Sequence, residues 1–392
     1  MSTAFEPTPD QRTIYDQACR FAQKELHPLL QRMDDEDWYP PGMMRTLGSN
    51  GYLGITAPAE YGGAEMDLFS SGLVAEAFAY WNANAAFIWG PHENLCLNNI
   101  LRNGDETQKK RYLPKLISGE WVGALALTEP GAGSDAMGSM RTTARRDGND
   151  YILNGAKLFI SNGPVADVVL VYARTAPELG PRGISAFIVE KGMAGFSVAQ
   201  KLKKMGWRGC PTGELVFDDC RVPAANLVGG EHLGVAVLMS GLDIERAFLC
   251  LPTIGEAQRC LDLSVEYANQ RVQFGKTIGE FQFVKGMLAD MYAELEAARS
   301  LAYRALWACN DLEKGGGGRG DIHKLCAAAI MTTGNMLLSV TDKAVQIHGG
   351  SGFIWETEVN RHYRNAKVST IGAGTNEIRR LIIADELLRA AR

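Results

Sequence analysis

The chain has 392 residues, which is too long for one hydrophobic core, so two or three packed units are expected. The composition, 46% hydrophobic and 22% charged, is that of an ordinary globular protein, and the net charge of -5 gives no support for nucleic-acid or general membrane binding. The sequence has no run of eighteen apolar residues and begins without a secretory signal pattern, so we expect a cytoplasmic, bacterial protein with no membrane span.

Residues 1–120 are predicted to form an N-terminal helical domain. Thr8-Pro9-Asp10-Gln11 combines a capping residue, a proline at the first helical position and a glutamine three residues after the cap. Helical spacing continues through Ile14 to Leu26, and a further helix is expected over 95–101.

Residues 121–233 are predicted to form a middle β-domain. Tyr151-Ile152-Leu153 precedes Asn154-Gly155, a pair that is typical of a tight hairpin turn. Further β-rich runs cover 157–161, 168–173, 184–189 and 214–217, with Gly, Pro and Asp between them. The pattern indicates short antiparallel strands and not the alternating strands and helices of a dinucleotide fold.

Residues 234–392 are predicted to form a C-terminal helical bundle. The glycines at 315–318 are interpreted as a flexible turn between antiparallel helices. The fold class is therefore α+β and multidomain. One long helix is indicated by apolar residues that alternate spacings of three and four, namely Phe281, Val284, Leu288, Met291, Leu295, Ala298 and Ala302.

Several common catalytic motifs are missing. No G-x-G-x-x-G follows a strand, and no G-x-S-x-G is found. Gly275-Lys276-Thr277 ends like a phosphate-binding loop, but Gln270 stands where the loop needs its first glycine. The eight cysteines form no C-x-x-C pair and the six histidines have no metal-ligand spacing, so no metal site is predicted.

Five segments resemble the acyl-CoA dehydrogenase family in both order and separation, and the similarity covers nearly the whole chain. The resemblance implies a helical, β, helical bundle fold, which agrees with the pattern described above, and it implies FAD as cofactor. The segments are LALTEPGAGSD at 125–135, KLFISNG at 157–163, RVQFG at 271–275, QIHGG at 346–350 and GAGTNE at 372–377.

The resemblance also implies which residues bind FAD. Leu127, Thr128 and Ser161 are assigned to the flavin ring, where donors stabilise the electron-rich reduced form, and Phe159 is assigned to packing against it. Arg271 suits the pyrophosphate because a guanidinium makes two-point contacts with phosphate oxygens. The full expected set is Leu125, Leu127, Thr128, Gly133, Ser134, Phe159, Ile160, Ser161, Arg271, Phe274, Gln282, Gln346, Gly349, Gly350, Thr375 and Glu377.

Family resemblance extends this expectation to partners. In the family, the arginine segment and the Gln-Ile-x-Gly-Gly segment reach the FAD of a neighbouring subunit, which implies a homo-oligomer, usually a tetramer. The resemblance also implies an electron-transferring flavoprotein as acceptor.

A carboxylate base must remove the α-proton of the acyl thioester while the flavin accepts hydride from the β carbon. Many family members place a glutamate where this chain has Ala373. Leu242-Asp243-Ile244-Glu245-Arg246 resembles the isovaleryl-CoA dehydrogenase branch, in which a glutamate from this helix is the base and alanine stands at the later position. Glu245 is therefore the predicted catalytic base. The expected substrate-binding residues are Ser134, Asp243, Arg246, Ala373 and Gly374.

The expected reaction is α,β-dehydrogenation of a short or branched acyl-CoA. Ala236, the segment 205–211 and Val368-Ser369-Thr370 differ from the branch, which leaves open the exact acyl group and whether it is carried on CoA or on a carrier protein. Two further hypotheses stay open: an oxygen-using oxidase or flavin monooxygenase on the same fold, and a non-catalytic flavoprotein.

Overall fold

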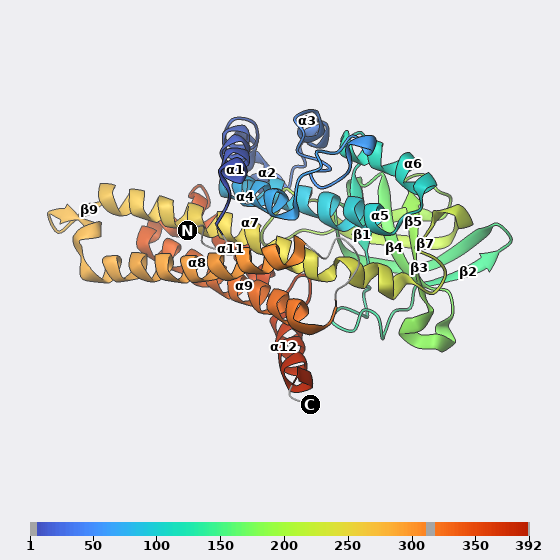
Figure 1. Ribbon diagram of the computed structural model, residues 1–392. Helices are drawn as coiled ribbons and strands as arrows, with labels where there is room; N and C mark the ends of the chain where they lie inside the picture. Colours follow the sequence, from blue (N-terminus) through green and yellow to red (C-terminus); the bar gives the residue numbers. More distant parts are fainter. Residues whose placement is uncertain (1–5, 311–317, 391–392) are drawn as a thin grey trace.

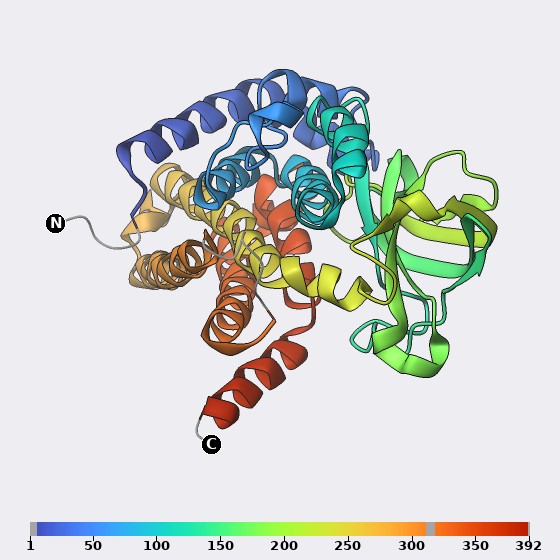
Figure 2. The same cartoon turned by 45° about the vertical axis from the view of Figure 1, so that its right-hand side comes forward.

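The computed structural model describes residues 6–310 and 318–390 (Figure 1). Helices from both ends of the chain pack together on one side, and the β-sheet lies on the other (Figures 1 and 2). This arrangement confirms the predicted fold class of a helical region, then a β region, then a helical bundle. None of the described helices combines the length and the apolar content that a membrane crossing requires.

The N-terminal region is helical, and its first helix begins as predicted. Thr8 caps α1 (Pro9–Phe21), and Gln11 returns the bond to the Thr8 backbone, which completes a capping box. The helix expected over 95–101 is also present, as a π-helical turn that runs into α5 (Asn98–Asn103). The other helical elements are η1 (Ala22–Leu26), η2 (His27–Leu29), α2 (Leu30–Asp35), α3 (Met43–Ser49), η3 (Ala59–Tyr61), α4 (Leu68–Gly90), η4 (Pro91–Leu97) and α6 (Glu106–Ile117).

The middle region is one sheet in the order β6-β7-β3-β2-β4-β5-β8, with β1 paired to β4. Most neighbours are antiparallel, as predicted, but β1 and β2 each run parallel to β4. Short 3-10 turns η5 (Gly163–Val165), η6 (Pro177–Gly183) and η7 (Ala224–Asn226) connect the strands. The strands are β1 (Gly123–Ala126), β2 (Thr143–Asp147), β3 (Asp150–Ser161), β4 (Val168–Arg174), β5 (Ile184–Glu190), β6 (Phe196–Lys201), β7 (Thr212–Pro223) and β8 (Leu227–Val228).

The hairpin predicted at Asn154-Gly155 is wrong. Strand β3 continues through both residues, and its pairing with β7 shifts register between Leu153 and Gly155. The Asn154 side chain exchanges two 2.9 Å hydrogen bonds with Asp219 on β7, so this pair forms a bulge and not a turn. The hairpin turn lies earlier in the chain, at Gly148 (φ 61°), where it joins β2 to β3.

The C-terminal region is a bundle built on the 37-residue helix α7 (Gly234–Gln270). The predicted long helix is α8 (Gln282–Cys309), and Met291, Leu295, Ala298 and Ala302 of its apolar stripe are fully buried. Of the predicted glycine turn, residues 315–317 lie outside the described part. The remaining elements are β9 (Val272–Gln273), β10 (Lys276–Thr277), η8 (Ile278–Glu280), α9 (Gly320–His348), α10 (Gly350–Phe353), α11 (Glu358–Ala366), η10 (Lys367–Thr370) and α12 (Asn376–Ala390).

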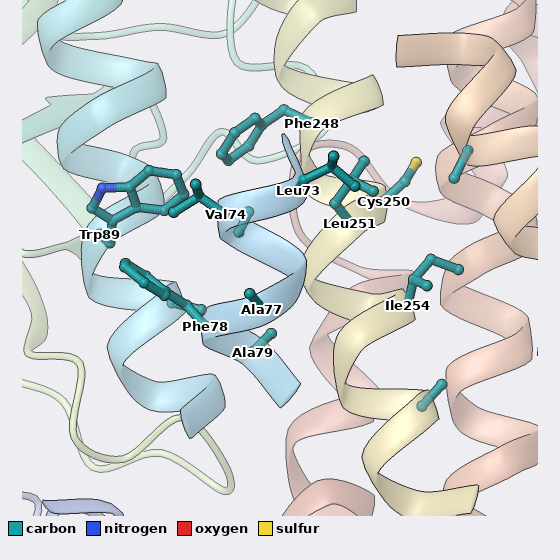
Figure 3. Packing of buried hydrophobic residues seen from close by; sticks show 14 of the residues in the cluster. Leu73, Val74, Ala77, Phe78, Ala79, Trp89, Phe248, Cys250, Leu251 and Ile254 are labelled. Carbon is teal, nitrogen blue, oxygen red and sulfur yellow. The ribbon is translucent and has the colours of Figure 1, made fainter. Parts of the chain in front are cut away.

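One apolar core joins the two helical regions. Helix α4 packs along α7, with Leu73 and Phe78 on one side and Phe248 and Leu251 on the other (Figure 3). Trp89 anchors this contact by donating a 2.6 Å hydrogen bond to the Tyr52 carbonyl. A second cluster, between the sheet and α5, α6 and α7, holds the start of α7 against the β-sheet. Burial of this kind stabilises by about 25 cal/mol per Å² of apolar surface, so the sheet and bundle are held in a fixed relation.

Candidate active site

The first predicted flavin segment leaves the end of β1. Leu127 and Thr128 follow the strand directly, and Leu158 N–H donates a 2.8 Å hydrogen bond to the Thr128 carbonyl. Within the described residues, neither the N–H nor the hydroxyl of Thr128 makes a hydrogen bond. Two donors are therefore available for a ligand. Leu125 and Leu127 face the cluster between sheet and helices.

The second predicted flavin segment is the end of β3. The register against β7 shifts between Lys157 and Ile160, and Phe159, within this bulge, has φ 61° and is 63% exposed. A left-handed aromatic residue costs about 1–3 kcal/mol, which the paired strands on both sides must offset. The result is that Phe159 presents its ring outside the core while Ile160 is buried and Ser161 pairs with Thr212.

The loop between these segments is open. Gly133 and Ser134 are exposed, and a Cβ added at Gly133 would meet no atom within 4 Å. Asp135 closes the loop by accepting a 2.5 Å hydrogen bond from the Ser139 hydroxyl. Ser134, predicted to contact both cofactor and substrate, is thus free of the core.

Glu245 lies on the first part of α7 and is partly buried. Burial raises the pKa of its carboxyl to about 7, against the opposing effect of Arg246 and Arg102. Where α7 packs on the sheet, its neighbour is Tyr172 on β4, and the pKa of Tyr172 is raised by burial and by the charge of Glu245. Strands β1 and β4 are paired up to Ala126 and Val171, so Tyr172, the neighbour of Glu245, lies where Leu127 leaves the sheet. A carboxyl that titrates near neutrality is suited to a general base.

Asp243 and Arg246 flank Glu245 but point into a buried network. One Asp243 oxygen lies 2.6 Å from His323 Nδ1 and 3.6 Å from Arg246 Nη1, and the other accepts a 2.7 Å bond from Gly318 N–H. Asp243 is 1% exposed. The structure therefore gives Asp243 protein partners, and its contact with substrate stays a prediction.

The last predicted segment forms a turn before α12. Ala373 (φ 53°) and Gly374 (φ 92°) are consecutive left-handed residues, and Thr375 Oγ1 accepts a 3.4 Å bond from Ile378 N–H at the start of the helix. Glu377 is exposed and pairs with Arg380 at 3.6 Å.

The sequence reasoning missed Arg379, which holds this turn in place. It is 1% exposed and donates to the carbonyls of Ser369 at 2.9 Å and Gly372 at 2.6 Å. An arginine on a terminal helix gives no sequence signal that it will be buried.

The remaining predicted FAD residues lie at the other end of the molecule. Helix α7 spans about 55 Å at 1.5 Å per residue, and β9 projects from the end farthest from the sheet (Figure 1). Arg271 follows this end directly, and Tyr267, which stacks on His348 with ring centroids 4.3 Å apart, brings the segment 346–350 beside it. This group contains Arg271, Phe274, Gln282, Gln346, Gly349 and Gly350. Within one chain, this group is therefore too far from Thr128 and Ser161 for both to contact the same FAD.

The second group is suited to a ligand carrying phosphate. Arg271 is exposed and has no acidic partner within the described chain. Gly349 (φ 58°) and Gly350 have open space where a Cβ would stand, so a ligand can approach the backbone closely. Phe274 is 92% exposed. These residues would bind the phosphates of FAD, and Thr128, whose N–H and hydroxyl make no hydrogen bond within the described residues, would bind its ring. The two groups together therefore fit FAD.

The fold and both groups of residues fit a flavin-dependent enzyme, and comparison with known proteins identifies its family. Models of the acyl-CoA dehydrogenase N-terminal, middle and C-terminal domains match residues 8–120, 124–220 and 232–388. The chain belongs to the acyl-CoA dehydrogenase family. Its cofactor is FAD, and its reaction class is oxidation of a CH–CH bond.

Individual relatives agree with this assignment. The chain is 43% identical to the mitochondrial isovaleryl-CoA dehydrogenase of Solanum tuberosum over 99% of this chain and 92% of the relative. Butyryl-CoA dehydrogenase from Megasphaera elsdenii superposes with a TM-score of 0.93 at 38% identity, covering 99% and 100% of the two chains. The prolyl acyl carrier protein oxidase AnaB superposes with a TM-score of 0.90 at 32% identity, covering 97% and 99%.

Proposed function

We propose that this enzyme dehydrogenates a short or branched acyl-CoA, with isovaleryl-CoA as the first candidate, and that Glu245 removes the α-proton. FAD, when bound, supplies the acceptor for the β-hydrogen and its electrons. The residues of the chain bind and orient the thioester, hold the flavin donors of Leu127, Thr128 and Ser161 in place, and take up the proton at a Glu245 carboxylate oxygen.

The observation that carries the proposal is the combination of a glutamate at position 245 with an alanine at position 373. A carboxyl whose pKa burial raises to about 7 lies near Tyr172 on β4, the strand paired to β1, while the family's other base position has only a methyl group. The charge of Glu245 adds to burial in raising the pKa of Tyr172, whereas Asp243 on the same helix is occupied by His323 and Gly318.

The acyl preference rests on side-chain size. Gly372 and Ala373 remove bulk beside the expected α–β bond, which leaves space for a branch. Ala236, which is exposed at the start of α7, allows a larger branched acyl group as the second choice.

The test is anaerobic mixing of purified holoenzyme with isovaleryl-CoA, 2-methylbutyryl-CoA, butyryl-CoA and palmitoyl-CoA while the flavin absorbance is followed. We expect the fastest bleaching with a short branched thioester. Highest kcat/KM for palmitoyl-CoA would contradict the proposed substrate class. Bleaching by any of them would exclude a non-catalytic flavoprotein.

A carrier-protein substrate is the second candidate, because a structural relative over nearly the whole chain, AnaB, is a prolyl acyl carrier protein oxidase. Presenting the same acyl group on CoA and on a phosphopantetheinylated carrier protein separates the two. Readmitting air to the reduced enzyme tests whether it works as an oxidase, since rapid return of the yellow colour would favour oxygen as the acceptor.

We further propose that the working enzyme is a homotetramer that passes electrons to an electron-transferring flavoprotein. The separation of Thr128 from Arg271 along α7 supports assembly, because two chains are needed to bring both groups to one FAD. Large exposed apolar side chains on the bundle, Phe274 at 92%, Phe283 at 91% and Phe353 at 86%, also support a buried subunit interface.

A further inference from the structure

A buried ion pair lies directly behind the flavin segment. Lys157 Nζ is 2.9 Å from Glu129 Oε1 and 3.1 Å from the carbonyl oxygen of Leu127. The two side chains are 0% and 4% exposed. Charged side chains are rarely buried so completely unless they are paired.

The pair joins three strands at one point. Glu129 follows β1, Lys157 lies on β3, and Glu129 accepts hydrogen bonds from Arg141 N–H at 2.6 Å and Thr142 N–H at 2.9 Å, just before β2. Burial by itself would raise the pKa of the Glu129 carboxyl, but Lys157 and these N–H donors together lower it. Burial lowers the pKa of Lys157 to about 8, with Glu129 opposing that shift. The pair is therefore ionised at neutral pH.

The bond to Leu127 fixes the direction of a different group. The Leu127 carbonyl and the Thr128 N–H belong to one planar trans peptide, so they point in opposite directions. Lys157 holds the carbonyl on the buried side, which leaves the Thr128 N–H directed away from Lys157. The next residue, Leu158, holds the following carbonyl, that of Thr128, at 2.8 Å. Both ends of the Thr128 backbone are thus fixed by consecutive residues of β3.

We propose that Lys157, held by Glu129, is a positioning residue that aims the Thr128 N–H at the flavin ring and strengthens it as a donor. The ammonium polarises the shared peptide, because hydrogen bonds in a chain reinforce one another where the dielectric is low. A stronger donor favours the electron-rich reduced flavin over the oxidised form. The inference rests on the proposed contact of Thr128 with the ring, and it is independent of the substrate and of Glu245.

A purely structural role makes a different prediction. Replacing both members of a buried ion pair by uncharged residues of similar shape is often neutral for stability. If the pair only supports the fold, Glu129→Gln/Lys157→Met should fold and bind FAD normally. If it positions Thr128, the same variant should fold but bind FAD poorly, since nothing then holds the Leu127 carbonyl.

The experiment compares apoprotein and holoprotein of Glu129→Gln/Lys157→Met without any acyl thioester. We expect the FAD dissociation constant of the folded apoprotein to rise by up to about tenfold, because the contact to the ring that is weakened comes from a neutral donor, the Thr128 N–H. We also expect the flavin midpoint potential to become more negative. A folded double variant with wild-type affinity and potential would overturn the proposal.

Two control variants match the other effects of the change. Arg221→Met removes an exposed ion-pair network of the same sheet, with Asp147 and Asp150, and should leave both readouts unchanged. Val189→Ala weakens the core of the same region at a fully buried position and reports what lost stability alone does to FAD affinity. An equal loss of affinity in Val189→Ala would also overturn the proposal.

A second variant decides the matter if the double variant fails to fold as apoprotein. Glu129→Gln keeps an acceptor for Thr142 N–H, takes away the acceptor of Arg141 N–H and removes the charge that holds Lys157. The potential of its holoprotein should therefore move in the same direction by a smaller amount. An unchanged potential in Glu129→Gln would then refute the positioning role. Because no substrate is present, either result leaves the test of the dehydrogenase reaction separate.

Discussion

Glu245 is partly buried beside two arginines, and both features matter for its chemistry. Burial raises the pKa of its carboxyl, while Arg246 and Arg102 limit the rise. A fully solvated glutamate would be ionised at neutral pH but would be a weaker base. Without its cationic neighbours, burial would raise the pKa of this carboxyl further. Position 245 lies between these extremes.

Glu245→Gln is predicted to keep FAD binding and abolish most substrate-driven flavin reduction. The amide preserves shape but cannot accept the proton, so the reduction rate should fall by roughly 10²–10⁴-fold. Stopped-flow absorbance with isovaleryl-CoA measures the rate. Glu266→Gln, an exposed change on the same helix, is the matched control. Wild-type reduction by Glu245→Gln would show that another group is the base.

Adding Ala373→Glu to Glu245→Gln is predicted to restore part of the rate, because a carboxylate would approach the same proton from the turn before α12. The left-handed φ of 53° at position 373 already accommodates a Cβ, so the substitution adds no backbone strain. The restored fraction should be small, since a displacement of about 1 Å can cost 10²-fold.

The pH dependence follows from the sign of the Glu245 shift. The base is active only when ionised, and its pKa in the free protein is raised to about 7. The value of kcat/KM should therefore increase as the pH rises through 7 and level off above it. Steady-state assays at constant ionic strength measure the profile. A profile already flat from about pH 5 to 8 would contradict this environment for Glu245.

At the scale of single elements, local signals were reliable where the contacts are local. The α1 capping box uses only Thr8 and Gln11, three residues apart, and it is present as predicted. The stripe on α8 also follows from spacing alone. Asn154-Gly155 failed as a turn because a residue from another strand, Asp219, engages the Asn154 side chain.

Thr8→Ala is predicted to lower the free energy of unfolding by about 1 kcal/mol, the usual cost of losing an N-cap. The Thr8 hydroxyl satisfies the Gln11 N–H, which the alanine would leave without its partner. Denaturant unfolding of the holoprotein measures the change. Thr13→Ala, on the exposed face of the same helix, is the control and should have a smaller effect.

At the scale of the whole molecule, the long helix α7 separates two halves of the expected cofactor site. Its first turns carry Glu245 against the sheet, and its last residue precedes Arg271 at the far end. A single chain can therefore present the ring contacts of one FAD and the phosphate contacts of another. The domain boundaries after residues 120 and 233 stay predictions.

This division predicts complementation between subunits. Arg271→Ala alone should weaken FAD retention by about 1.5–3 kcal/mol, the value of a charge-assisted bond. Thr128→Val should weaken it through the ring contact. Hybrids of the two chains should regain tight FAD in a fraction of sites, because one site then combines the intact Thr128 and the intact Arg271. Absorbance of co-expressed, doubly tagged hybrids measures the FAD content.

Two outcomes would contradict a cofactor site shared between subunits. Hybrids that bind no more FAD than either parent would place both contacts within one chain or remove Arg271 from the cofactor. A protein that is monomeric by light scattering while retaining FAD would do the same.

Residue order and spacing were enough to predict the three-part fold and the family, because both are linear patterns. The flavin segments and the combination of Glu245 with Ala373 were inferred from the same kind of pattern and stay predictions. Packing in three dimensions decided which groups lie together. It buried Arg379 under the 372–374 turn, brought Asp243 into contact with His323, and brought Lys157 to the carbonyl of Leu127. Those contacts join residues 7 to 80 positions apart, where burial and charge, and not local spacing, determine the neighbour.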